Sequence, residues 1–552
     1  MSDNIPRQMT ARRGFSLSYK GKNLLSTIDP VSQGERLVQN TPKTERTLYL
    51  CPSPLYGYGL SALLDALPQD SAILCVEADS ELFAFSKKAM ADLLGKAPSL
   101  IKLIKSDDPA LVCAFIHQVW GKRRFRRVEV LRLSLGWQLF PAVYESLAEA
   151  ISRHFASDWS NAATLMKLGR RYMLNAVRNL SLFARSRSLS ELSFGNAPIL
   201  VLGAGPSLDY ILEGLAKVAG STLSDRNFKI VCADTALRAL FERGIKPDLA
   251  VALECQHWNL QDFTGLGNWE IPLAMDFSAL PQTHEALGSE IFLFVTPWTS
   301  LRFFKRLKEA MARTEIIPPL GSVGLTATEA ARRLSSGTIV TGALDFSYTM
   351  DVFHARSTPS RLEKLRRQNR FKSLIDAESA FRYGSFDTHS KLGEVVRTNL
   401  TLKNYRDIFE AEFAGCENIL DISTTGLDLG LKALSLEDAI EILQRKDIST
   451  DEIVLQDCID GNKAETVMIF INQEKERLVK LRDALMGTES LTRDETEILL
   501  DECDYLWAHF PDCAGTDGRR PSAENISFLN RVRIEIEPIL NRFELALKEL
   551  KL

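Results

Sequence analysis

The feature that most constrains the fold is a series of short apolar segments that alternate with helical patterns between residues 195 and 430. Short, wholly apolar segments bounded by turn residues are typical of buried strands. They are APILVLG, FKIVCAD, DLAVALE, PLAMD, EIFLFV and GTIVTGA, and amphipathic patterns such as TALRALFERG and VGLTATEAARRL separate them. Strands that alternate with helices form mostly parallel sheets covered on both faces. We therefore predict an α/β domain with a mostly parallel sheet over residues 195–430.

Further regions flank this domain, since 552 residues exceed what one hydrophobic core supports. Residues 1–150 alternate the strand-like runs TLYLC, AILCVEAD and VEVLRLS with helical patterns, which predicts a Rossmann-like α/β domain. Apolar residues spaced three and four apart predict a helical connector over 151–194. Residues 431–552 show only amphipathic helical patterns, which predicts a C-terminal helical bundle.

Charge and cysteine usage narrow the class of protein. The net charge of −4 provides no electrostatic reason to expect nucleic-acid binding. No apolar run approaches the roughly 20 residues of a membrane-spanning helix, and the first residues lack the apolar core of a signal peptide. The nine cysteines form no CxxC pair, so neither a disulfide framework nor a zinc site is indicated. We expect a cytoplasmic protein without membrane insertion or a metal site.

The segment VLGAGPSLDY (201–210) carries the first candidate binding motif. A strand that meets a glycine turn and then a helix start directs backbone N–H groups toward an anion. Asp209 stands where a dinucleotide fingerprint has its third glycine, and the GK[ST] of a P-loop is absent. The turn suits a phosphate held by N–H groups and a serine hydroxyl without a lysine. The residues predicted to bind it are Gly203, Gly205, Pro206 and Ser207.

Polar residues also follow three later segments of the same domain. Asp234 ends the strand in VCADTAL, where an acid either binds a ribose or caps the next helix. Glu254 lies at the carboxyl end of the strand DLAVALE, at the edge where parallel sheets bind ligands. Gly321 and Ser322 begin the helical pattern VGLTATEAARRL and form a second glycine-serine turn. This turn predicts a second anion-binding helix start.

The order of these motifs resembles one family. The segments GAGPSL, ADTALRALFERGIKPDLAVALE, GSVGLTATEAARRL, TGALDFSY and HARST are similar to the motility accessory factor (Maf) family. The central domain also resembles the 6-hydroxymethylpterin diphosphokinase-like domain, and its glycine-serine turns resemble those of small bacterial sialyltransferases. The resemblance covers residues 190–430 and extends to GKNLLSTIDPVSQGERLV (21–38), whereas the helical tail is similar only in kind.

The resemblance implies a glycosyltransferase with a sialyltransferase-like central domain. Maf proteins are implicated in attaching nonulosonic acids, such as pseudaminic or legionaminic acid, to Ser and Thr of flagellin in the cytoplasm. The donor in such a reaction is the CMP-activated sugar, and CMP is a good leaving group that requires no metal. The reaction needs a base for the acceptor hydroxyl and dipoles that hold the leaving phosphate. The expected partners are therefore flagellin and a CMP-activated nonulosonic acid, with no required cofactor.

Two histidines are candidates for the base, since an unperturbed imidazole titrates near neutrality. His354 in MDVFHARST follows the strand end DFSY, as in the Maf pattern, whereas His389 in FDTHSKLGEV resembles the sialyltransferase base by its order along the chain. Asp345, just past the strand GTIVTG, is a third catalytic candidate. Tyr348 either binds the phosphate or sugar carboxylate or packs at the strand edge.

Two other functions stay open. The diphosphokinase resemblance implies transfer of pyrophosphate from Mg-ATP to a pterin, with Mg²⁺ held by acids such as Asp234, Glu254 and Asp345. The large N- and C-terminal regions argue against it, because an enzyme of a small substrate does not need them. The other alternative is a non-catalytic assembly factor that binds flagellin on an inactive nucleotide fold.

Overall fold

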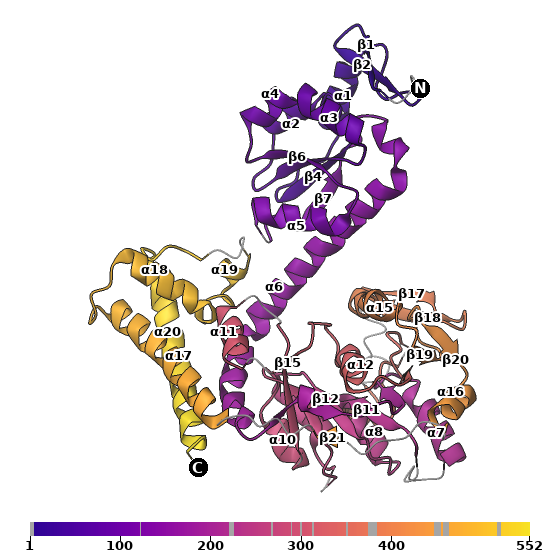
Figure 1. The fold of residues 1–552 in the computed structure, drawn as a ribbon, viewed down its shortest axis with the longest axis vertical. Coiled ribbons are helices and arrows are strands. Elements are labelled where there is room, and N and C mark those ends of the chain that lie inside the picture. Colours follow the sequence, from indigo (N-terminus) through magenta and orange to yellow (C-terminus); the bar gives the residue numbers. More distant parts are fainter. Residues whose placement is uncertain are drawn as a thin grey trace. The chain divides into compact units, whose positions relative to one another are not determined.

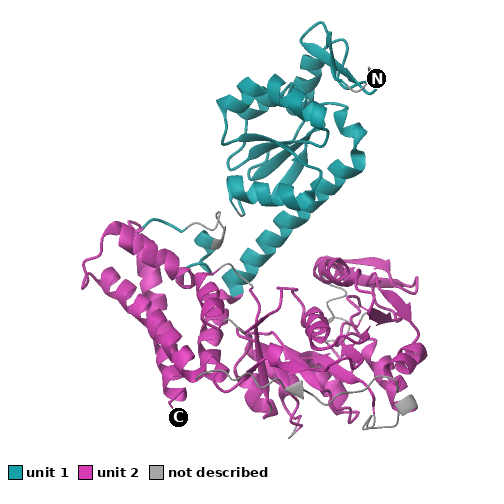
Figure 2. Ribbon diagram, viewed as in Figure 1, with its two compact units in different colours: residues 1–167, 507–522 teal, residues 168–506, 523–552 magenta. Residues whose placement is uncertain are grey.

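The protein is described here by a computed structural model, and its chain divides into two compact units (Figure 2). The first unit comprises residues 1–167 and 507–522, and the second comprises 168–506 and 523–552. Residues 151–183 of the predicted connector belong to one long helix, α6 (Pro141–Phe183), whose residues are divided between the units. The remainder of the connector is not helical as predicted, because it contains the short strands β8 (Arg187–Ser188) and β9 (Leu192–Ser193). The structure describes residues 5–121, 123–219, 226–266, 269–288, 290–297, 301–311, 314–348, 352–371, 373, 384–445, 454–455, 463–515 and 520–551.

The first unit contains a four-stranded parallel sheet in the order β6–β5–β4–β7 (Figure 1). Its strands are β4 (Thr47–Pro52), β5 (Ala72–Glu77), β6 (Ile101–Lys105) and β7 (Arg127–Val130). An antiparallel sheet of β1 (Arg7–Thr10), β2 (Phe15–Tyr19) and β3 (Lys22–Asn23) precedes it. Every residue of β4 and β5 is buried, as their apolar runs predict.

Alternation along β4 explains how both faces of this sheet are covered, because successive side chains point to opposite faces of a strand. Leu48 and Leu50 pack with α5 (Pro109–Trp120) and the first part of α6. Tyr49 and Cys51 pack on the other face with α1 (Pro30–Gln39), α2 (Leu60–Asp65) and α4 (Ala91–Lys96). The first unit is therefore an α/β domain with two hydrophobic layers.

The second unit contains a ten-stranded sheet in which all strand pairs are parallel. The order is β15–β14–β13–β12–β11–β10–β16–β19–β20, and β8 also pairs with β14. Its strands are β8 (Arg187–Ser188), β10 (Ile199–Leu202), β11 (Lys229–Ala233), β12 (Leu249–Ala252), β13 (Leu273–Asp276), β14 (Ile291–Val295), β15 (Glu315–Ile316), β16 (Ile339–Gly342), β19 (Ile419–Ile422) and β20 (Lys432–Leu434). The predicted α/β fold with a mostly parallel sheet is thus confirmed.

The strand order reverses beside β10. Strands from β11 to β15 add along one side of β10, and the chain then returns to place β16 on the other side. Such a reversal leaves a crevice at the carboxyl ends of the two central strands, where α/β proteins bind ligands. The turn at Gly203 follows β10 directly, and Ala343 follows β16. The topology therefore brings these two turns to one position.

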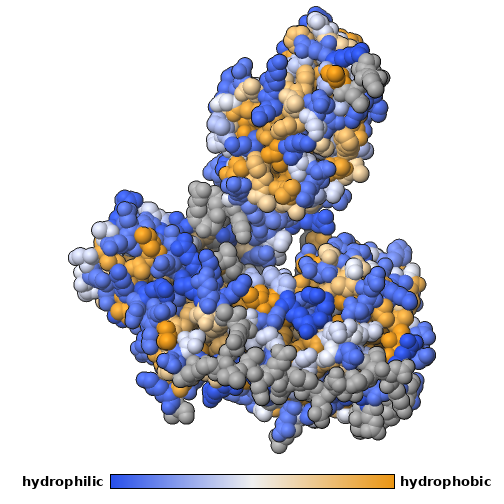
Figure 3. Space-filling view, in the orientation of Figure 1, coloured by the Kyte–Doolittle hydropathy of each residue, from blue (hydrophilic) through white to orange (hydrophobic). Residues whose placement is uncertain are grey.

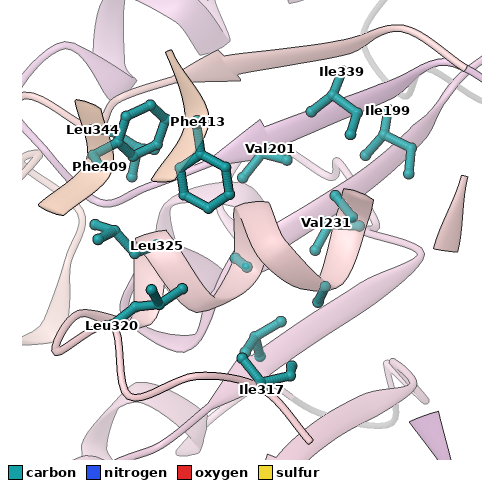
Figure 4. Close-up of a cluster of buried hydrophobic side chains, with 14 of the residues drawn as sticks. Ile199, Val201, Val231, Ile317, Leu320, Leu325, Ile339, Leu344, Phe409 and Phe413 are labelled. Atoms are coloured by element: carbon teal, nitrogen blue, oxygen red, sulfur yellow. The ribbon is translucent and has the colours of Figure 1, made fainter. Parts of the chain in front are cut away.

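The helix α12 (Val323–Leu334) packs on β10, β11 and β12 at the centre of the second unit. Leu325 of this helix belongs to the same hydrophobic core as Ile199, Val201 and Val231 of the sheet (Figure 4). Phe409 and Phe413 of α15 (Leu400–Phe413) belong to the same core. This packing positions the first turn of α12 near the carboxyl edge of the sheet.

The C-terminal region is mainly helical, as predicted. Its helices α17 (Lys463–Met486), α18 (Arg493–Glu502) and α20 (Ile526–Glu549) pack together, and α11 (Arg302–Ala310) joins them (Figure 1). β20 and α16 (Leu436–Leu443) lie beyond the predicted boundary at residue 430, yet β20 pairs with β19 of the large sheet. α16 also packs on α7 (Leu208–Ala219), so this stretch completes the sheet region.

Most large apolar side chains of the described chain lie in the cores of the two units. On the face shown in Figure 3, hydrophobic residues form small groups among hydrophilic ones. Within the part of the chain that the structure describes, no helix is both long and apolar enough to cross a membrane.

Candidate active site

A pocket of about 170 Å³ lies at the reversal of strand order in the second unit. Its walls come from the turns after β10, β11 and β16, the first turn of α12, the segment at residue 354, and α15. The residues that line it are Gly203, Ala204, Gly205, Ala233, Thr235, Ser322, Val323, Gly324, Ala343, Leu344, Asp345, Phe346, Ser347, Phe353, His354, Leu402 and Tyr405. Both predicted glycine turns thus meet at one site.

Asp345 ties the first glycine turn to the loop after β16. Its Oδ2 accepts a hydrogen bond from Ser207 N at 2.9 Å, and its Oδ1 accepts one from Ser207 Oγ at 2.6 Å. Thr424 Oγ1 lies 3.4 Å from the same Oδ1. Both Ser207 and Asp345 are buried. The predicted phosphate donors of Ser207 are therefore directed to Asp345 in this structure, and neither Ser207 nor Pro206 lines the pocket.

The two glycines allow this close approach of backbone to backbone. A Cβ on Gly203 would lie 2.3 Å from the carbonyl oxygen of Ala343, and a Cβ on Gly205 would lie 2.2 Å from Asp345 Oδ2. The loop on the other side is itself unusual, since Ala343 and Phe346 have φ values of +58° and +48°. Non-glycine residues adopt such values mainly where the surrounding structure holds them. The glycine motif thus positions the loop that carries Asp345.

The N-terminus of α12 opens on the pocket. Ser322 is its N-cap residue, and the Ser322 side chain makes no capping hydrogen bond. The first N–H groups of a helix have no intrahelical partner, and the helix dipole favours an anion there. Gly321 has a φ of +81°, and a Cβ at this position would lie 2.8 Å from the Tyr405 ring. The Ser322 hydroxyl and these amides are therefore the anion-binding groups that the site offers.

Asp234 lies beside the pocket, but its neighbour Thr235 forms the wall. The buried carboxylate accepts hydrogen bonds of 2.7 Å from Thr235 N and from Asn259 Nδ2. Burial raises the pKa of Asp234 from 3.8 to about 6, and the charge of Glu254 acts in the same direction. Asp234 begins a 3-10 turn and is not the cap residue of α8 (Leu237–Phe241). Glu254 accepts a 2.9 Å hydrogen bond from Gln256 N and does not line the pocket.

His354 is the predicted base that lines the pocket. Its Nδ1 lies 3.1 Å from Ser360 Oγ, and Ala355 N donates to the carbonyl of Ala204 at 3.1 Å. Burial lowers the pKa of His354 from 6.5 to about 4, and the charge of Lys364 adds to the effect. The ring is therefore neutral at pH 7. When Nδ1–H donates to Ser360, the lone pair of Nε2 is available to accept a proton.

The other two predicted residues of this region lie elsewhere. His389 is the exposed last residue of β17 (Ser385–His389), which pairs with β18 (Val395–Asn399) in a hairpin. The hydroxyl of buried Tyr348 accepts a hydrogen bond of 2.7 Å from Asn399 Nδ2. Its ring lies 5.5 Å from that of Phe353. Neither residue lines the pocket, and Tyr348 packs against the strand edge.

Several pocket residues escaped the sequence analysis, among them Thr235 and Tyr405. Thr235 directly follows Asp234, so its position after the strand could have pointed to it. Tyr405 comes from α15, far along the chain from the glycine turns, and no motif marks it. Burial raises the pKa of Tyr405, and the charge of Glu254 adds to this. The Tyr405 hydroxyl therefore stays protonated and can act as a hydrogen-bond donor.

Comparisons with known proteins agree with the α/β fold described above. The 6-hydroxymethylpterin diphosphokinase MptE-like family model matches residues 170–351. The solved structure of a Maf glycosyltransferase from Magnetospirillum magneticum AMB-1 matches with a TM-score of 0.53 and 13% sequence identity, over 98% of this chain and 90% of that chain. The chain thus has a Maf-like fold with an MptE-like segment at its centre, which confirms both resemblances.

One protein is similar in sequence over nearly the whole chain, and its description names no activity. It is a protein of Treponema pallidum (strain Nichols), described as uncharacterized. The two chains are 27% identical over 555 residues, which span 96% of this chain and 94% of the relative. The sequence similarity therefore extends over nearly the full length of both chains.

Proposed function

We propose that this protein is a glycosyltransferase that acts on flagellin in the cytoplasm during flagellum assembly. It transfers a nonulosonic acid of the pseudaminic or legionaminic type from a CMP-activated donor to a Ser or Thr hydroxyl. The observation that carries the proposal is the meeting of His354 with the N-terminus of α12 in one pocket. A base and an anion-binding dipole are what transfer from a phosphate leaving group requires. The Maf-like fold supports the class, and the resemblance of the motifs supports the donor and acceptor.

The pocket suggests how each bond changes. The acceptor oxygen attacks the anomeric carbon of the sugar, and the bond from that carbon to the phosphate oxygen breaks. The proton of the hydroxyl passes to Nε2 of His354. CMP leaves with its negative charge facing the first amides of α12 and the Ser322 hydroxyl. Asp345 contributes by holding the glycine turn through Ser207. This sequence of steps requires no cofactor.

The MptE-like match favours a second candidate, a diphosphokinase that uses Mg-ATP. Mg²⁺ is bound through carboxylates and substrate phosphates. Among the described residues that line the pocket, Asp345 is the only one with a carboxylate. Both oxygens of that carboxylate accept hydrogen bonds from Ser207. Asp234 and Glu254 lie outside the walls, and Asp234 is engaged by Thr235 and Asn259. The acid positions therefore fit a magnesium site poorly, which favours the glycosyltransferase.

Thermal-shift titration with nucleotides separates the candidates, because a ligand that binds the folded state raises Tm. The purified chain is titrated with CMP and with ATP, each with and without Mg²⁺. We expect CMP to raise Tm without metal and Ser322→Ala to reduce this shift. A shift by ATP only in the presence of Mg²⁺ would support the diphosphokinase. No shift with either nucleotide would support a non-catalytic assembly factor.

A further inference from the structure

Two helices of the first unit bring a pair of histidines and an aspartate together. His117 lies in the last turn of α5, and His154 and Asp158 lie four residues apart on α6, which places them on one face of that helix. His117 Nε2 lies 2.8 Å from His154 Nε2 and 2.8 Å from Asp158 Oδ2. One ligand atom from each of the three residues lies within 4.8 Å of the other two. No spacing in the sequence indicated this cluster, because α5 and α6 are separate elements.

His117 Nε2 cannot make two good hydrogen bonds at once, one to His154 and one to Asp158. In a neutral imidazole, Nε2 either donates one hydrogen bond or accepts one. If His117 Nε2–H donates to Asp158, its single proton is shared between that oxygen and His154 Nε2. If His117 Nε2 instead accepts a proton from His154, its lone pair faces the negative carboxylate of Asp158. Either arrangement leaves one of the two 2.8 Å contacts weak or repulsive.

A cation at the centre of the cluster removes this conflict, because all three atoms then direct lone pairs at it. We propose that His117, His154 and Asp158 bind a divalent cation of the zinc class, with water completing the coordination. Two imidazoles and a carboxylate suit zinc and similar transition metals, whereas Ca²⁺ and Mg²⁺ prefer oxygen ligands. Zinc bonds of about 2.0–2.2 Å place tetrahedral ligands about 3.3 Å apart, so the two short contacts widen by about 0.5 Å.

The surroundings allow the ion to enter and explain what it would stabilise. The side chains of His117 and Asp158 are 19% and 18% exposed, so the cluster is reached from solvent. Cys113 lies one turn before His117 on α5, but it is not part of the 4.8 Å group. α5 and α6 cover the same face of the four-stranded sheet. The bound ion therefore cross-links two helices of one hydrophobic layer, and its binding free energy adds to the stability of the first unit.

Titration of the full-length chain with Zn²⁺ alone tests the proposal. The protein is dialysed against a chelator, transferred to metal-free buffer and titrated by calorimetry. We expect one tight site in the natural chain and a loss of more than about tenfold in affinity for His117→Ala, His154→Ala and Asp158→Asn. His257→Ala removes an exposed histidine of the second unit and is the matched control, with unchanged affinity. Asp158→Asn preserves the shape of the side chain, so it tests the site even where a histidine variant fails to fold.

Two results would overturn the proposal. One is the lack of stoichiometric Zn²⁺ binding by the natural chain, and the other is equal binding by the natural chain and Asp158→Asn. Substitution with Co²⁺ tests the ligand set separately, since thiolate ligands add charge-transfer absorption that imidazole and carboxylate do not. We expect no such absorption. Its appearance, together with its loss in Cys113→Ser, would contradict the three-residue site completed by water.

Discussion

Asp234 and Asp345 are both buried, but Asp345 lines the pocket whereas Asp234 lies beside it, and their hydrogen-bond partners differ. Asp345 accepts two hydrogen bonds from Ser207, one of which comes from the main chain. Asp234 lies near the charge of Glu254, and its pKa is raised to about 6 mainly by burial. Asn259 Oδ1 is buried without a hydrogen-bond partner, so a rotated Asn259 amide could accept the proton of a neutral Asp234. Asp345 thus positions the turn, whereas Asp234 tends to hold a proton.

Asp234→Asn should remove a pH dependence of stability. The folded-state pKa of about 6 exceeds the ordinary value of 3.8, so between these values the folded chain keeps a proton that the unfolded chain has lost. Stability of the natural chain therefore falls as pH rises through this window and is lowest above it. We expect Asp234→Asn to be more stable than the natural chain by about 3 kcal/mol at pH 8 and near equal at pH 4. Tm measured from pH 4 to 8 checks this, and parallel curves would contradict it.

His354→Asn should reduce sugar transfer while nucleotide binding persists. Asn can still bond Ser360 but cannot accept the proton of the acceptor hydroxyl. Loss of a general base lowers the rate by roughly 100-fold or more. The rate of sugar transfer to flagellin and the CMP-induced rise in Tm are measured for His354→Asn and for a second variant, His389→Asn. His389→Asn is the control, since exposed His389 lies outside the pocket walls. Full activity of His354→Asn with loss in His389→Asn would place the base on the hairpin.

The strands around the pocket meet at two turns that lie in close contact, so that a Cβ added at Gly203 or Gly205 would clash with the facing turn. β10 and β16 pair in register, so the turns that follow them emerge next to each other. Gly205 N donates to the carbonyl of Ala343 at 3.0 Å, and this bond joins the two turns. The position of Asp345 therefore depends on the contact between the turns that follow β10 and β16, and not only on the residues next to it in sequence.

Gly205→Ala should disturb this junction. The new Cβ would lie 2.2 Å from Asp345 Oδ2, so the Asp345 loop must shift. We expect a loss of about 1–3 kcal/mol in stability and a weaker CMP-induced shift in Tm. Gly415→Ala is the control, because an added Cβ there has nothing within 4 Å. Equal Tm values for the two variants would show that the loop yields without cost.

A buried ion pair joins α11 to α17 in the second unit. Arg306 donates to both carboxylate oxygens of Glu474 at 2.6 and 2.9 Å, and the Glu474 side chain is fully buried. Glu474→Ala should cost about 3–5 kcal/mol, because it leaves the Arg306 charge partly buried without its partner. Lys475→Ala removes a more exposed pair with Glu544 and should cost less than about 1 kcal/mol. Chemical unfolding of both variants gives the comparison, and similar losses would contradict a special role for Glu474.

At the scale of the whole molecule, each unit has its own hydrophobic cores and its own candidate site. The first unit contains the layers on both faces of the four-stranded sheet and the His117 cluster. The second contains the core around α12 and the pocket. Because a ligand stabilises the unit that binds it, the two proposed ligands, CMP and Zn²⁺, should act on different parts of the chain.

Calorimetric unfolding of the full chain should therefore show two transitions that respond to different ligands. We expect Zn²⁺ to raise the Tm of one transition of the natural chain. In the presence of Zn²⁺, Asp158→Asn should lower the Tm of that same transition. CMP should raise the Tm of the transition that Gly205→Ala lowers. Differential scanning calorimetry with each ligand alone and with both distinguishes the two effects. A single transition that both ligands shift equally would show that the units unfold together.

Local patterns determined the strands, the glycine turns and the helix start at Ser322, because apolar periodicity and turn chemistry act over a few neighbouring residues. The α/β architecture followed from the order of those elements. Only the tertiary structure decided that Ser207 bonds Asp345, that His354 lines the pocket while His389 does not, and that Tyr405 completes a wall. It also decided that His117 meets His154. These contacts join side chains from distant segments, and strand order and helix packing, which no local pattern encodes, bring those segments together.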